Sequence, residues 1–163
     1  MRIYLAAPLF SGAELAFNVH LARRLEQYAE VYLPQRDGLL YSKHISTAEQ
    51  RASARRVLFE KDCEAIIRSD VIVAVLDGRS VDEGVAFELG LAFARQITCV
   101  GLQTDPRRLM GGENNPMIAE SLIASFESSD DLLQWVQEYS TPLLWGQPTA
   151  RALTAHVMSP STA

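Results

Sequence analysis

The chain is poor in the residues that build disulfide frameworks and metal sites. Among its 163 residues are two cysteines, Cys63 and Cys99, and neither belongs to a Cys-x-x-Cys pair. Its three histidines, His20, His44 and His156, do not have the spacing of metal ligands. This pattern disfavours both a disulfide scaffold and a zinc site, and we expect neither a metal nor another cofactor.

Several common signatures of function are also missing. The sequence contains no P-loop, no Gly-x-Gly-x-x-Gly element and no Gly-x-Ser-x-Gly element. The formal net charge of −5 disfavours nucleic acid as a partner, because such partners favour a basic face. No apolar run approaches the roughly 20 residues of a membrane-spanning helix, and the N-terminus lacks a signal-peptide pattern. We therefore expect a cytoplasmic protein that contacts neither nucleic acid nor a membrane.

What the sequence does contain is an alternation of strands and helices. Apolar runs predict strands at residues 3–7, 31–33, 71–76 and 97–101. Periodicity and capping patterns predict helices at residues 11–30, 47–68, 80–94, 117–124 and 130–138. The alternation predicts an α/β fold, a flavodoxin-like or Rossmann-like three-layer sandwich with a five-stranded parallel sheet. We expect one catalytic domain over residues 1–140 and a C-terminal tail over residues 141–163, either frayed or packed on a neighbouring subunit.

One acid interrupts the most apolar helical segment. Glu88 is the only charged residue between Glu83 and Arg95. A carboxylate in such surroundings is costly to bury unless a partner compensates its charge. Glu88 is therefore either a nucleophile or general base, or a core acid satisfied by a tyrosine or an arginine. Gly84, one helical turn earlier, favours the first alternative, because it leaves no side chain to shield Glu88 from a ligand.

Two further acids flank the central strand. In parallel sheets ligands bind beyond the carboxyl ends of the strands, and Asp82 and Glu88 directly follow the strand at 71–76. Asp82 alone also fits the role of a helix cap, although we expect a capping box between Ser80 and Glu83.

Asp62 lies within the preceding helix and is either a solvated acid or a site acid, with Glu64 as an equal candidate. Tyr4 in the first strand is either a core residue or the hydrogen-bond partner of an acid, because a buried phenol needs a partner.

Three segments resemble the nucleoside 2-deoxyribosyltransferase family. Residues 3–10 are similar to the family's first strand and substrate loop. Residues 82–90 resemble its nucleophile segment, and residues 115–117 resemble its Asn-x-Met element. The segments occur in the family's order and spacing, and Asp62 falls where the family has a base-contacting aspartate. The resemblance covers the whole predicted catalytic domain.

By this resemblance, the enzyme transfers a 2-deoxyribosyl group between nucleobases of 2′-deoxynucleosides. Glu88 would be the nucleophile that attacks C1′, and Tyr4 would hydrogen-bond and orient it. Asp62 and Asp82 would contact the base, and one of them would supply the proton that the leaving nitrogen needs. Two successive inversions, through a covalent glycosyl-enzyme, predict net retention of configuration.

The resemblance also implies an active site shared between subunits. Asn115 and Met117 would reach the 5′ side of the sugar from an adjacent subunit. The remaining substrate-binding residues would be Ala7, Phe10, Gln35 and Gly84. We therefore expect a homo-oligomer built from dimers, up to a hexamer, whose only other partners are a deoxynucleoside and a free nucleobase.

Two alternatives compete with transfer. A hydrolase of nucleosides or their 5′-monophosphates would use the same glutamate, but its relatives carry a serine in place of Asn115 and a Ser/Arg-bearing first loop. Residues 7–10 of this chain offer no side chain that could donate to a phosphate. A non-catalytic flavodoxin-like module gives no reason for an acid in the apolar helix, and a phospho-receiver would have acids where Ala6 and Ala7 stand.

Overall fold

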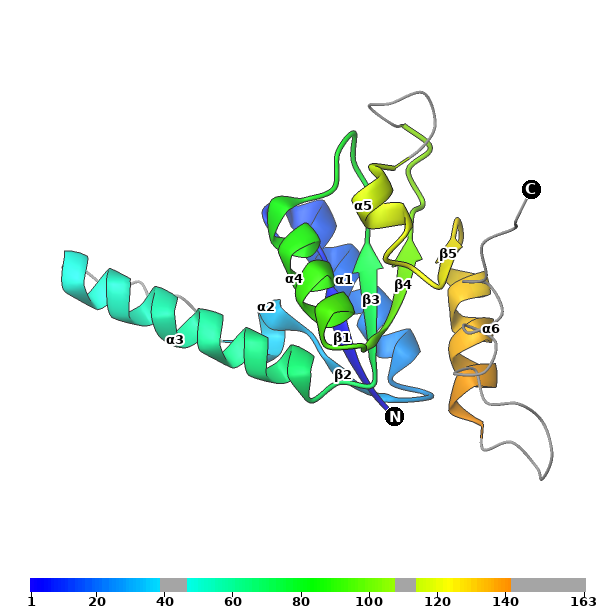
Figure 1. Ribbon diagram of the computed structural model, residues 1–163, viewed down its shortest axis with the longest axis horizontal. Coiled ribbons are helices and arrows are strands. Elements are labelled where there is room, and N and C mark those ends of the chain that lie inside the picture. The colour runs from blue at the N-terminus through cyan, green and yellow to red at the C-terminus, as the bar shows by residue number, and fades with distance from the viewer. Residues whose placement is uncertain (39–46, 108–113, 142–163) are drawn as a thin grey trace, which may run out of the picture.

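The computed structural model describes residues 1–38, 47–107 and 114–141 (Figure 1). Its elements in chain order are β1 (Arg2–Ala6), α1 (Gly12–Leu25), β2 (Glu30–Tyr32), α2 (Pro34–Asp37), α3 (Ala48–Ile67), β3 (Val71–Val75), α4 (Glu83–Ala94), β4 (Thr98–Leu102), α5 (Pro116–Ala119), β5 (Ala124–Phe126) and α6 (Ser129–Ser140). Of the predicted tail only Thr141 falls within the described residues, so the tail's packing stays a prediction. No helix in these three stretches is long and apolar enough to cross a membrane.

The five strands form one parallel sheet in the order β2-β1-β3-β4-β5. The sheet confirms the predicted five-stranded parallel architecture. β3 lies at its centre, and β1 lies between β2 and β3, because the chain adds β2 on one side of β1 and then crosses over to add β3 on the other. The switch in strand order therefore lies between β1 and β3, where α/β proteins usually bind ligands.

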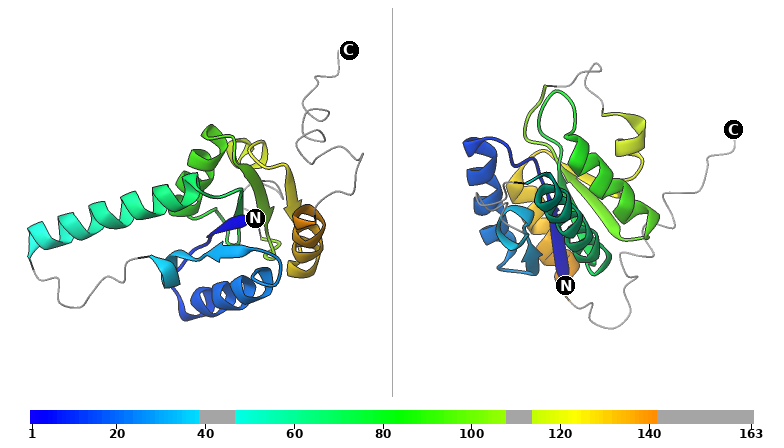
Figure 2. Two further views of the ribbon diagram at one scale, coloured as in Figure 1. Left: turned by 90° about the horizontal axis from the view of Figure 1, so that it is seen from below. Right: turned by 90° about the vertical axis from the view of Figure 1, so that its left-hand side faces the viewer.

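Helices cover both faces of the sheet, as the three-layer prediction required (Figures 1 and 2). Successive strand residues point to opposite faces, so Ile3 and Leu5 pack under α1 and α6, whereas Tyr4 and Ala6 pack under α3 and α4. The N-terminal half of α3 extends away from the body of the molecule in both figures. The two faces of β1 thus belong to two separate cores.

Capping residues fix where the helices begin. Thr47 and Gln50 form the predicted capping box at the start of α3. The capping box predicted between Ser80 and Glu83 is wrong, because α4 begins at Glu83 and Asp82 is its N-cap. A carboxylate directly before the first helical residue reaches the free N–H groups of the first turn, so Asp82 takes the role assigned to the serine.

Two short elements differ from the sequence-based expectation. α2 lies between the strand predicted at 31–33 and the helix predicted at 47–68, where the sequence predicted neither a strand nor a helix, and it begins at Pro34 because proline has the backbone geometry of a first helical position. The helix expected over 117–124 is shorter and shifted: α5 ends at Ala119, and β5 follows as the fifth strand. Three residues are too few for strand alternation to appear in the sequence.

Gly101 allows the segment after α5 to approach the sheet. A Cβ atom at this position would lie 2.8 Å from a methyl carbon of Leu76 and 2.9 Å from one of Leu122. Real Cβ atoms do not come so close, so a side chain at residue 101 would displace one of these leucines. Leu122 lies shortly after the end of α5, and its amide donates to the carbonyl of Ala119, the last residue of that helix.

Candidate active site

Tyr4 and Glu88 form a hydrogen-bonded pair under α4. Tyr4 lies in the middle of β1 and is fully buried. Its hydroxyl donates to Oε1 of Glu88 at 2.5 Å. This is the hydrogen bond expected between a buried phenol and an acid. It is compatible with both roles considered for Glu88, a catalytic group and a core acid. A tyrosine can satisfy a core acid, and it can equally hold a nucleophile in one orientation.

The surroundings shift the titration of Glu88 towards neutrality. Burial, together with the smaller effects of the charges of Asp62 and Asp82, raises the pKa of its carboxyl to about 7. The hydrogen bond from Tyr4 opposes these effects, because it stabilises the ionised form. Burial and the neighbouring Glu88 in turn raise the pKa of Tyr4, so its hydroxyl stays protonated and donates. Glu88 is therefore a desolvated acid that both gains and loses its proton near neutral pH.

A second tyrosine–carboxylate pair lies beside the first. The hydroxyl of Tyr32, at the end of β2, donates to Oδ1 of Asp62 on α3 at 2.9 Å. The rings of Tyr4 and Tyr32 are stacked, with centroids 5.4 Å apart and planes inclined by 16°. Burial raises the pKa of the Asp62 carboxyl, while the Tyr32 hydrogen bond and the charge of Lys61 lower it. The site therefore holds two acids, each bound by a phenol.

The structure decides between the two acid candidates on α3. Glu64 is exposed and forms an ion pair with Arg68 at 2.5 Å, one turn along the same helix. Asp62 instead packs towards the sheet and contacts Tyr32. Asp62 is thus the acid that shares the surroundings of Glu88, and Glu64 belongs to the solvated face of the helix.

Asp82 caps α4 on the side of the site. Its Oδ1 accepts hydrogen bonds from the backbone N–H groups of Gly84 at 2.9 Å and Val85 at 3.1 Å. A Cβ atom at Gly84 would lie 3.1 Å from that oxygen, so the glycine leaves the capping carboxylate undisturbed. The capping role is therefore present, and a contact between Asp82 and a base stays a prediction.

The predicted substrate-loop residues have different surroundings. Ala7 is buried at the carboxyl end of β1, whereas the Phe10 side chain is 79% exposed. Gln35 uses both ends of its amide within the chain: Oε1 accepts from Nδ2 of Asn18, and Nε2 donates to the carbonyl of Leu15, each at 2.9 Å. In this conformation Gln35 joins α2 to α1, and base recognition by its side chain stays a prediction.

Asn115 and Met117 lie on α5, on the same face of the sheet as α4 (Figure 1). Asn115 caps the helix, with its Oδ1 accepting from the backbone N–H of Met117 at 2.9 Å. The Met117 side chain is 82% exposed. Their expected contribution to a neighbouring subunit's site stays a prediction for a single chain.

Sequence reasoning missed Tyr32. A phenol at the end of a short buried strand needs a partner, and that signal was available. What the sequence could not give is the strand register, which sets Tyr32 directly beside Tyr4. Among residues 1–38, 47–107 and 114–141, no group of three or more His, Cys, Asp or Glu side chains could hold a metal ion.

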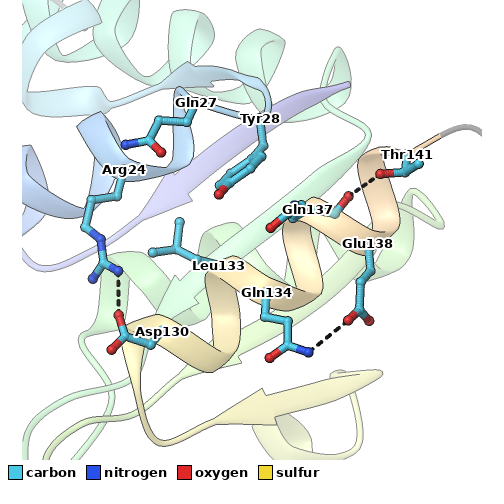
Figure 3. A pocket seen from close by; sticks show the side chains of 9 residues that line it. All are labelled: Arg24, Gln27, Tyr28, Asp130, Leu133, Gln134, Gln137, Glu138 and Thr141. Carbon is cyan, nitrogen blue, oxygen red and sulfur yellow. Dashed lines mark hydrogen bonds and ion pairs between the residues drawn. The ribbon is translucent and has the colours of Figure 1, made fainter.

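A groove of about 710 Å³ lies on the opposite side of the sheet, between α1 and α6 (Figure 3). Its acids, Asp130 and Glu138, are exposed, and Asp130 forms an ion pair with Arg24 at 2.5 Å. Tyr28 and Leu133 also line the groove. The partly buried acids Glu88 and Asp62, rather than this groove, identify the candidate active site.

Known proteins similar to this chain carry the same fold. A conserved protein from Enterococcus faecalis V583 is 28% identical over 84% of this chain and 97% of that one, with a TM-score of 0.68. A 2-deoxyribosyltransferase from Bacillus psychrosaccharolyticus is 24% identical over 88% of this chain and 100% of that one, with a TM-score of 0.69. A CMP N-glycosidase from Clostridium botulinum is 18% identical over 85% of this chain and 99% of that one, with a TM-score of 0.51. No curated protein matched significantly.

The family assignment comes from the sequence profile of the nucleoside 2-deoxyribosyltransferases, which matches residues 3–133. This range includes both tyrosine–carboxylate pairs and the cap of α4. It removes the alternative of a non-catalytic flavodoxin-like module. The chain therefore belongs to the nucleoside 2-deoxyribosyltransferase family, and it is an enzyme with deoxyribosyltransferase or related N-glycosidase activity.

Proposed function

We propose that this enzyme transfers the 2-deoxyribosyl group between the nucleobases of 2′-deoxynucleosides, with Glu88 as the nucleophile. The observation that carries the proposal is the hydrogen bond from the buried Tyr4 hydroxyl to Oε1 of Glu88. That bond fixes one carboxylate oxygen and leaves Oε2 to attack. A pKa of about 7 means that a substantial fraction of Glu88 is ionised at neutral pH, as a nucleophile must be.

The first half of the reaction breaks the N-glycosidic bond. Oε2 of Glu88 bonds to C1′ as the bond from C1′ to the base nitrogen breaks, and the electron pair of that bond leaves with the base. The sugar passes through an oxocarbenium-like state, which the adjacent carboxylate stabilises. The product is a covalent glycosyl-enzyme with inverted configuration.

Asp62 is the better candidate for protonating the departing base. Burial raises the pKa of its carboxyl, which favours the protonated form that a general acid needs. Asp82 instead commits Oδ1 to two backbone N–H groups at the start of α4. Asp82 would contact the base, and Asp62 would transfer the proton.

The second half reverses the first with a different base. The new base nitrogen attacks C1′ from the original face and gives its proton to Asp62, while the Glu88 oxygen leaves. Two inversions give net retention of configuration. Water in place of the acceptor base would give hydrolysis, which is the second candidate function.

We also propose that the enzyme acts as a homo-oligomer. Phe59 of α3 and Phe87 of α4 are each about half exposed, and their rings lie 5.8 Å apart. An exposed aromatic patch of this kind is typical of a surface that a partner covers. A second copy is the partner that the shared-site expectation for Asn115 and Met117 requires, and sedimentation analysis of the purified enzyme would detect it.

Product analysis tests the proposed function. The enzyme is incubated with 2′-deoxyinosine, with and without adenine, and the products are separated by chromatography. We expect 2′-deoxyadenosine when adenine is present, little free deoxyribose, and an intact-mass gain of one deoxyribosyl group when acceptor is withheld. Rapid release of free deoxyribose whether or not adenine is present would favour the hydrolase instead.

A further inference from the structure

We propose that Tyr32 is a positioning residue that holds Asp62 for proton transfer to the leaving base. This inference rests on the proposed function and assigns a role to a side chain which the mechanism above does not use. It is carried by two contacts that Tyr32 makes at once, a hydrogen bond to Asp62 and a ring stack on Tyr4.

The two contacts follow from the strand register. Tyr32 and Tyr4 are direct partners in the β1–β2 ladder, so their side chains leave the same face of the sheet next to each other. The nearly parallel rings, inclined by 16°, keep the Tyr32 hydroxyl on the α3 side and the Tyr4 hydroxyl on the α4 side. Each phenol therefore serves one acid, and the stack fixes the two acids relative to each other.

The Tyr32 hydrogen bond selects which oxygen of Asp62 can act. Because the hydroxyl donates to Oδ1, the proton of a protonated Asp62 is carried by Oδ2. Oδ2 is then held in one orientation, as a general acid requires, since small displacements of a reacting group are costly to rate. Without Tyr32, the carboxyl of Asp62 could rotate and present either oxygen to the base.

Several other charged or titratable groups act on Asp62 or on Tyr32. They are Lys61 and Cys63 on α3, Glu88 on α4, Tyr4 on β1 and Asp37 on α2. Lys61 stabilises the ionised form of Asp62, as the Tyr32 hydrogen bond also does. Removing the Tyr32 hydroxyl takes away one of these two stabilising interactions, so the Asp62 carboxyl keeps its proton to higher pH.

The test compares two variants that each lose one phenol hydroxyl. Tyr32→Phe keeps the ring and its stack but removes the hydrogen bond to Asp62. Tyr139→Phe is the matched control, since the hydroxyl of Tyr139 lies 3.1 Å from that of Thr98 and well away from Asp62. We expect Tyr32→Phe to lower kcat for 2′-deoxyinosine by about tenfold with little change in KM, and Tyr139→Phe to leave both unchanged.

Two readouts separate positioning from a structural role. The alkaline limb of the kcat/KM profile should move to higher pH in Tyr32→Phe and not in Tyr139→Phe. With 7-methyl-2′-deoxyguanosine, whose base is already positively charged and leaves without a proton, Tyr32→Phe should react at nearly the wild-type rate. In an Asp62→Asn background, Tyr32→Phe should cause no further loss with 2′-deoxyinosine.

Three results would overturn the inference while leaving the transferase intact. These are an unchanged pH profile in Tyr32→Phe, an equal loss of rate on the two substrates, or a full tenfold loss that persists in the Asp62→Asn background. An equal loss would also be the outcome if the variant folded poorly. Failure of the proposed function is distinguishable, because the wild-type enzyme itself would then not transfer deoxyribose.

Discussion

The helices α3 and α4 hold two desolvated acids against one face of the sheet, whereas the fully buried residues of the core under α1 and α6 are all aliphatic. The same strands build both faces, since neighbouring residues such as Ile3 and Tyr4 point in opposite directions. The α1–α6 side has the 710 Å³ groove, but its charges lie at an exposed rim (Figure 3). The α3–α4 side has the tyrosine–carboxylate pairs.

The two sides of the sheet differ in how far their acids are exposed to water rather than in which residue types they contain. Both have tyrosines and acids, but the ion pair between Arg24 and Asp130 is exposed to water, which screens its charges. Glu88 is removed from water and has a phenol as its partner, so its pKa is shifted to about 7. An acid becomes a candidate for catalysis when its surroundings oppose its charge.

The strongest test of the contrast is removal of an acid from each face. Glu88→Ala should reduce deoxyribosyl transfer by roughly a thousandfold or more, because it removes the carboxylate that we propose forms the bond to C1′. Glu138→Ala, the control on the α1–α6 side, should retain wild-type activity. Steady-state transfer rates measure both, and near-normal turnover by Glu88→Ala would remove the nucleophile assignment.

Removing one phenol from each face should give a smaller effect. Tyr4→Phe deletes the hydrogen bond that stabilises ionised Glu88, so the pKa of Glu88 should rise above about 7. In the proposed mechanism Glu88 attacks in its ionised form, so the acid limb of the kcat profile should move to higher pH and the rate at pH 7 should fall by roughly tenfold to a hundredfold. Tyr28→Phe in the opposite groove should leave the profile unchanged. If the acid limb did not move in Tyr4→Phe, it would not reflect the titration of Glu88.

The desolvation of Glu88 should also lower the free energy of unfolding when this acid is ionised. The folded-state pKa of Glu88, about 7, lies above its ordinary value, so the folded protein binds a proton that the unfolded chain has released. The contribution of this group to the free energy of unfolding therefore decreases as pH rises towards 7. Well above pH 7, Glu88→Gln should be more stable than the wild type by about 3 kcal/mol, and the difference should shrink as the pH falls towards 5. Thermal unfolding across this range measures the effect, and a constant difference would contradict it.

The smallest effect is expected at the exposed ion pair. Asp130→Ala removes the partner of Arg24, and exposed pairs of this kind contribute about 0–1 kcal/mol. We expect a change in the free energy of unfolding below about 1 kcal/mol by urea denaturation, and unchanged transfer activity. A loss of activity in this variant would show that the α1–α6 groove takes part in function after all.

Local patterns in the sequence were enough to predict most of the fold. The apolar run at residues 71–76 became the central β3, and the capping box at Thr47 is present. β5 was missed because three residues have too little pattern. The start of α4 was misassigned because a serine and an aspartate both make good caps, and only the backbone shows which one is used.

The candidate site could be predicted only where one residue stood out by itself. Glu88 was conspicuous as an acid in an apolar helix, and Tyr4 as a phenol that needs a partner. Asp62 could not be separated from Glu64, since that choice depends on how α3 is rotated against the sheet. Tyr32 was not predicted because its position beside Tyr4 depends on the register of two strands 28 residues apart in the chain.

The absence of a side chain at Gly101 couples the packing of the sheet to the position of the segment that follows α5. Leu122, which follows α5, rests where a methyl group at residue 101 would stand. Substituting alanine there would push either Leu76 or the segment carrying Met117 outwards. If Met117 serves a neighbouring subunit, as we propose, one added carbon inside one molecule would alter the sugar pocket of the next.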